Sequence, residues 1–136
     1  MSAYLNKAKT NLQIANDLLL EHGGVEVTSA HFSYYSVFLL MKYLLHHYMG
    51  DCYENQEQET KGRDSHKILS DKVLLNLASS DVTNVNDYIT FYNHLNNIRR
   101  KADYVNEPIP QAVLEKSKDN AQEFFDKSSQ LYNFVV

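Results

Sequence analysis

A short run of residues in the C-terminal half of the chain combines three kinds of side chain that can do chemistry. It has the sequence Ile-Arg-Arg-Lys-Ala-Asp-Tyr and contains the only three adjacent cations in the chain. Arg99 and Asp103 are four residues apart and share one face of a helix, where the carboxylate can fix the orientation of the guanidinium fork. Tyr104 adds a phenol within the same helical turn. The spacing therefore makes Arg99, Asp103 and Tyr104 the candidate catalytic residues.

The same cations also have a purely structural explanation. Arg99, Arg100 and Lys101 fall at the C-terminal end of a predicted helix, where positive charge interacts favourably with the helix dipole. Asp103 can then be no more than the partner of Arg99 in a structural ion pair. Spacing alone leaves both interpretations open.

Metal and thiol chemistry find little support in the sequence. None of the six histidines has Glu or Asp three residues before it and no two are four apart, so we predict no metal site and no cofactor. The four glycines do not form a phosphate-binding loop. Cys52 lies between Asp51 and Tyr53 without a neighbouring base, and we expect a surface thiol with no catalytic role.

Hydrophobic spacing indicates that helices position these residues. Residues 85–104 carry apolar side chains at alternating steps of three and four, the cleanest helical pattern in the chain. Residues 50–63 are polar and without periodicity, so we predict a solvated loop there. The sequence predicts an all-α, up-and-down bundle of four to five helices in a single domain, residues 1–136. The expected helices cover about residues 3–22, 27–49, 65–78, 85–104 and 110–134.

Net charge, hydrophobicity and cysteine content exclude some classes of protein. The chain has 136 residues and a formal net charge of −4, which argues against a uniformly basic protein that coats nucleic acid. No run of about 20 apolar residues is present, so we expect no membrane-spanning helix. The single cysteine suggests a reducing compartment, and we expect a cytoplasmic protein.

Two motifs resemble those of HEPN domains. The segment Ser-Ala-His-Phe-Ser-Tyr-Tyr-Ser-Val-Phe, residues 29–38, resembles the aromatic pair, small residue, x, Phe signature of the second HEPN helix. The pattern Arg99-x-x-Ala102-Asp103-Tyr104 resembles the signature that ends the fourth helix in one branch of the family. The order of the elements agrees over about residues 3–134.

The resemblance implies a helical bundle that dimerises through the motif helix and associates with RNA, often as a metal-independent ribonuclease. In catalytic branches, four to six residues separate the Arg from a following His. Here the window that begins five residues after Arg99 holds Tyr104, Val105 and Asn106, so that His is absent. A tyrosine has an unperturbed pKa near 10 and is a poor base at neutral pH.

Three hypotheses follow from the resemblance and the residues. In the leading one, a homodimer brings two basic clusters to one cleft for RNA or nucleotide phosphate, bound by Arg99, Arg100, Lys101 and Tyr104. In the second, the protein is a non-catalytic module that partners a nucleotidyltransferase, as in toxin–antitoxin pairs or defence systems. In the third, it is a ribonuclease that uses Arg99 with Tyr104 or with the distant His66 or His94.

Overall fold

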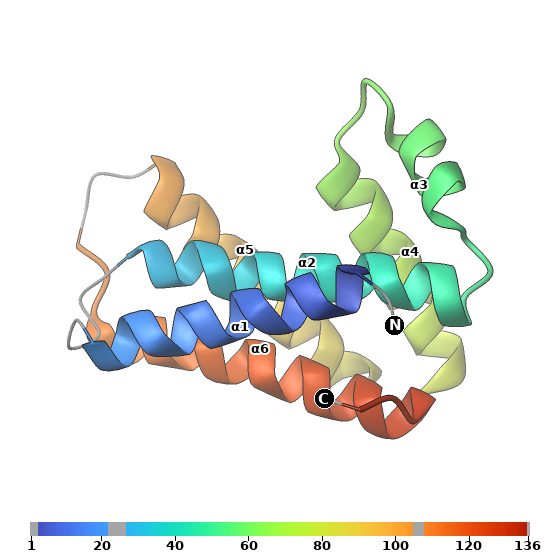
Figure 1. The fold of residues 1–136 in the computed structure, drawn as a ribbon. Coiled ribbons are helices and arrows are strands. Elements are labelled where there is room, and N and C mark those ends of the chain that lie inside the picture. Colours follow the sequence, from blue (N-terminus) through green and yellow to red (C-terminus); the bar gives the residue numbers. More distant parts are fainter. Residues whose placement is uncertain (1–2, 22–26, 105–107, 136) are drawn as a thin grey trace.

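Six helices make up the computed structural model, which describes residues 3–21, 27–104 and 108–135 (Figure 1). The prediction of an all-helical protein is confirmed, and the described residues contain no strand. Val105, Asn106 and the predicted end of the first helix at His22 lie outside the described residues. The helices are α1 (Ala3–Glu21), α2 (Thr28–Tyr48), α3 (Tyr53–Thr60), α4 (Ser65–Ser80), α5 (Val85–Tyr104) and α6 (Gln111–Tyr132).

The predicted loop at residues 50–63 is wrong in part, because it contains the helix α3. Only Gln56 of this helix is buried, so no apolar periodicity marks it in the sequence. Polar contacts hold it instead: the Gln56 amide donates to the backbone oxygens of Lys42 and Asp51 at 3.0 and 2.8 Å. Lys72 of α4 forms ion pairs with Asp51 and with Glu59 of α3. These bonds make a sixth helix out of a segment that lacks a hydrophobic face.

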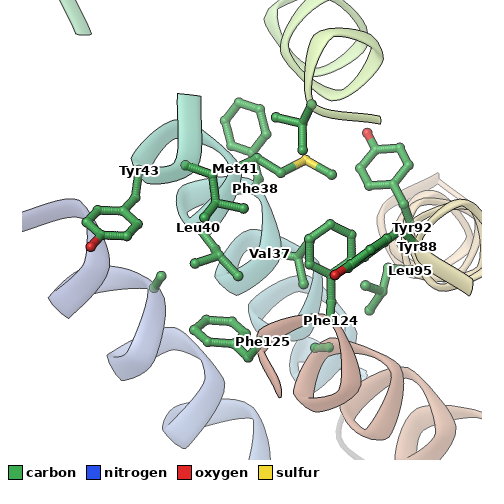
Figure 2. Packing of buried hydrophobic residues seen from close by; sticks show 14 of the residues in the cluster. Val37, Phe38, Leu40, Met41, Tyr43, Tyr88, Tyr92, Leu95, Phe124 and Phe125 are labelled. Carbon is green, nitrogen blue, oxygen red and sulfur yellow. The ribbon is translucent and has the colours of Figure 1, made fainter. Parts of the chain in front are cut away.

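The helix α2 is the centre of the bundle and packs against all five other helices. Its side chains Phe38 and Leu45 are buried, whereas Phe32, Tyr35 and Lys42 are only partly buried. Because neighbours surround the helix, several of its faces are covered, and a single stripe does not describe it (Figure 2). Its fully buried side chains include Tyr34, Val37, Leu40, Met41 and Leu44.

Apolar stripes of three other helices lie in the core. In α1, α4 and α6 the alternating small and large apolar residues face the interior, among them Ala8, Leu69, Val73 and Phe124. Burial of these side chains is the main favourable contribution to folding, at about 25 cal/mol per Å² of apolar surface. Among the described residues, no helix has both the length and the apolar character needed to cross a bilayer.

The helices α4 and α5 create the geometry of the site. Figure 1 shows α1, α2 and α6 running along one another, whereas α4 and α5 cross α2 steeply. The beginning of α4 and the end of α5 extend to the same side of α2 and diverge from each other. Residues of both helices, together with Tyr35 of α2, line one cleft.

Candidate functional site

A cleft of about 710 Å³ lies between the first half of α4 and the second half of α5. The predicted residues Arg99, Arg100 and Tyr104 line it, whereas Lys101 lines an adjoining hollow of about 450 Å³. Tyr35 of α2 contributes to its wall. The remaining lining residues are Asp64, His66, Lys67, Ser70, Asp71, Tyr92, Asn93 and Asn96.

Arg99 is held in place on three sides, and only 14% of its side chain is exposed. Its guanidinium carbon lies 4.5 Å from the centroid of the Tyr34 ring, a cation–π contact. One terminal nitrogen donates to Asn96 Oδ1 at 2.8 Å, and the other lies 3.8 Å from Asp103 Oδ2. The predicted Arg99–Asp103 pair is therefore present. The buried Nε has no hydrogen-bond partner among the described residues, so the fork retains a donor that is not satisfied.

His66 stands at the start of α4 and reaches the same aromatic cluster. Asp64 caps this helix by accepting a hydrogen bond from the Lys67 backbone nitrogen at 3.2 Å, which fixes the turn that carries His66. The Tyr34 hydroxyl lies 2.7 Å from His66 Nδ1 and 3.1 Å from the Tyr92 hydroxyl. A phenol has one proton, so Tyr34 donates to one of these neighbours and accepts from the other.

Burial and the nearby Arg99 guanidinium lower the pKa of His66. The imidazole is therefore neutral at physiological pH, the form that can accept a proton. Burial and the Tyr92 hydroxyl raise the pKa of Tyr34, which keeps that side chain a phenol. Since Tyr34 occupies Nδ1 of His66, Nε2 is the ring nitrogen left for a ligand.

His31 is a neighbour of the site that the sequence did not reveal. Its Nδ1 lies 3.6 Å from Asp103 Oδ1, and its ring centroid lies 4.4 Å from that of Tyr35. Asp103 therefore lies between His31 and Arg99. Because His31 and Asp103 are 72 positions apart, only the position of His31 inside the aromatic motif gave any signal.

The three adjacent cations do not form one cluster. Arg99 is turned inward, while Arg100 and Lys101 are exposed and form no ion pair within the described part of the chain. Lys67, the third cation of the cleft, pairs with Asp71 at 3.0 Å. Arg100 is therefore the lining cation that has no ion pair among the described residues, and the carboxylate of Asp64, which caps α4, lies in the same cleft.

Other candidates lie elsewhere. His94 does not line the cleft; its Nε2 is buried without a hydrogen-bond partner among the described residues, and burial together with Lys116 lowers its pKa. Cys52 is an exposed free thiol immediately before α3. Within the described ranges, no group of three or more His, Cys, Asp or Glu side chains is arranged to hold a metal ion.

The fold and the cleft define a helical bundle with an arginine-containing polar site between two diverging helices. The sequence model of the HEPN domain matches residues 1–136, the whole chain. The protein belongs to the HEPN family, whose members are typically associated with nucleotides or RNA. A comparison with curated proteins and another with solved structures each found no match.

Proposed function

We propose that the cleft between α4 and α5 binds phosphate groups of RNA or of a nucleotide. The observation that carries this proposal is the fixed guanidinium of Arg99 at the wall of the cleft. A pre-oriented arginine fork binds phosphate with little loss of side-chain entropy. Arg100 adds an unpaired charge at the rim, and Tyr104, 77% exposed, offers a hydroxyl and a ring on which a base can stack.

The proposed active form is a homodimer in which the α5 helices of two copies face each other. Arg100, Lys101 and Tyr104 are exposed on α5 and would then line a shared cleft. Two copies of these cations produce a local positive potential even though each chain has a net charge of −4. The negative net charge of the chain is therefore compatible with RNA binding at this one surface.

Fluorescence anisotropy of a labelled single-stranded RNA at low salt tests this proposal. We expect the wild type to bind and Arg100→Ala to bind about tenfold more weakly, the loss typical of one charged hydrogen bond. Lys61→Ala removes the same charge from an exposed position outside the cleft and is the matched control. Equal affinities for the two variants, or no binding by the wild type, would contradict the proposal.

A second candidate function is metal-independent cleavage of RNA. The observation that favours it is the position of His66 in the same cleft as Arg99, because an imidazole whose pKa is lowered by burial can accept the proton that the missing motif His would take. In the presence of EDTA, we expect the wild type to cleave RNA and His66→Ala to be slower by about 10²-fold. Cleavage no faster than in buffer would remove this function and leave the binding proposal standing.

Partnership with a nucleotidyltransferase, in a toxin–antitoxin pair or defence system, stays a prediction. Purification of the native complex tests it. A copurifying nucleotidyltransferase supports the non-catalytic alternative if the protein then fails to bind RNA.

A further inference from the structure

The cleft between α4 and α5 carries opposite charges on its two sides. Arg99 and Arg100 of α5 line one side, and Asp64, the cap of α4, lines the other. Both sides act on His66: besides burial, the Arg99 charge lowers the pKa of this imidazole, and the Asp64 charge raises it. A phosphate is attracted to the side of α5 and repelled from Asp64, so the base of a nucleotide is the part that can face Asp64.

The carboxylate of Asp64 is fixed in position but keeps acceptor capacity. Its Oδ1 accepts one hydrogen bond, from the Lys67 backbone nitrogen at 3.2 Å. It forms no ion pair with any residue that the structure describes. A carboxylate has about four acceptor sites, so both oxygens can accept hydrogen bonds from a ligand. Asp71, the other carboxylate of the cleft, is instead paired with Lys67 at 3.0 Å.

Capping of α4 does not by itself require a carboxylate at position 64. Asn and Ser cap helices about as well as Asp, and the negative charge adds a modest favourable interaction with the helix dipole. In a cleft that binds phosphate, the same charge repels the ligand unless hydrogen-bond donors of the ligand meet it. The charge of Asp64 therefore favours a base that presents donors and no acceptor to it.

We propose that Asp64 selects guanine among the bases of the RNA or nucleotide in this cleft, an assignment that rests on the phosphate-binding function proposed above. Bases of single-stranded RNA are read on their Watson–Crick edges. Guanine presents two adjacent donors there, N1–H and N2–H, which match the two oxygens of one carboxylate. Adenine and cytosine place a ring-nitrogen acceptor beside their amino group, and uracil places a carbonyl oxygen on each side of N3–H. The carboxylate repels these acceptors.

Competition between short RNAs tests the assignment. Three unlabelled adenosine oligomers carry guanosine, inosine or adenosine at one central position, and each displaces a labelled single-stranded RNA, followed by fluorescence anisotropy at low salt. Inosine keeps N1–H and lacks the N2 amino group. We expect the wild type to bind the guanosine RNA about tenfold more tightly than the adenosine RNA, with the inosine RNA between them.

Two substitutions on α4 separate base selection from charge and capping. Asp64→Asn keeps a capping side chain but has a single acceptor oxygen, so it should bind the guanosine and adenosine RNAs equally. Asp71→Asn is the control, because it removes a carboxylate from the same helix and the same cleft. It frees Lys67 from its ion pair and should tighten binding of all three RNAs without changing their order. A purely structural effect would weaken all three alike and leave the ratio unchanged.

The possible results distinguish this inference from the proposed function. Equal wild-type affinities for the three RNAs, or a guanosine preference that persists in Asp64→Asn, would overturn the role of Asp64 and leave phosphate binding standing. An inosine RNA bound as tightly as the guanosine RNA would overturn the pairing with N2–H. A wild type that binds none of the RNAs overturns phosphate binding together with this inference.

Discussion

Substitution of Tyr34 by phenylalanine tests the hydrogen-bonded network beneath the cleft. Tyr34 is fully buried, and its hydroxyl joins His66 Nδ1 at 2.7 Å to the Tyr92 hydroxyl at 3.1 Å. Phenylalanine keeps the ring and its packing against Arg99, so no large cavity forms. The substitution therefore removes two hydrogen bonds and leaves the buried Tyr92 hydroxyl and the half-buried His66 imidazole without their partner.

The expected cost follows from these two bonds. A buried hydrogen bond contributes about 0.5–1.5 kcal/mol net, so Tyr34→Phe should lower the free energy of unfolding by roughly 1–3 kcal/mol. For a domain of this size, each kcal/mol corresponds to about 3–4 °C, giving a fall in Tm of roughly 3–12 °C. The imidazole of His66 also loses the contact that fixes its orientation.

Urea unfolding followed by circular dichroism measures this difference. Tyr43→Phe is the matched control, since Tyr43 lies on the same helix and loses only a 3.4 Å contact with the Tyr48 hydroxyl. Tyr48 is 40% exposed, so water can replace that contact, and we expect a cost below about 0.5 kcal/mol. Equal free energies of unfolding for the two variants would refute the claim that Tyr34 anchors a buried polar network.

Three further predictions concern stability. Lys72→Met removes the cation that pairs with the nearly buried Asp51 and should cost about 1–2 kcal/mol, with amide hydrogen exchange in α3 accelerating first. Acidification from pH 7.5 to 5.5 should destabilise the protein, because burial lowers the pKa of His66 below its ordinary 6.5 and the unfolded chain then binds the proton more readily. His66→Gln should reduce this loss in urea titrations at the two pH values, and an unchanged pH dependence would contradict it. Phe124→Ala empties a fully buried core position and should cost about 3–5 kcal/mol by the same titration.

Local patterns were sufficient for most of the fold. The helix expected at residues 85–104 is observed as Val85–Tyr104. It could be predicted because its own residues show the apolar spacing and a proline follows at position 108. The helix α3 could not be predicted in the same way. Its stability depends on Lys72, which lies 13 residues beyond Glu59 in the sequence, and on the buried side-chain amide of Gln56. A polar side chain such as Gln56 adds nothing to a hydrophobic pattern.

Only the contacts between residues of one helix could be predicted for the candidate site. Arg99 and Asp103 pair as expected, since four residues on one helix bring them together. The contacts of Arg99 with Tyr34, and of Asp103 with His31, join α5 to α2 across more than 60 positions of sequence. From the sequence, His66 was only a candidate distant from Arg99. The residues around His66 in the sequence do not indicate that α4 and α5 border one cleft.

Chemical-shift mapping by NMR during titration with a single-stranded RNA oligonucleotide tests the central claim most directly. The account predicts that the Nε–H signal of Arg99, the imidazole signals of His66 and the ring signals of Tyr104 shift together and saturate. The groove between α1 and α6, lined by Lys9 and Lys118, should remain unchanged. Largest shifts in that groove, or none at the cleft, would contradict the assignment of phosphate binding to the cleft between α4 and α5.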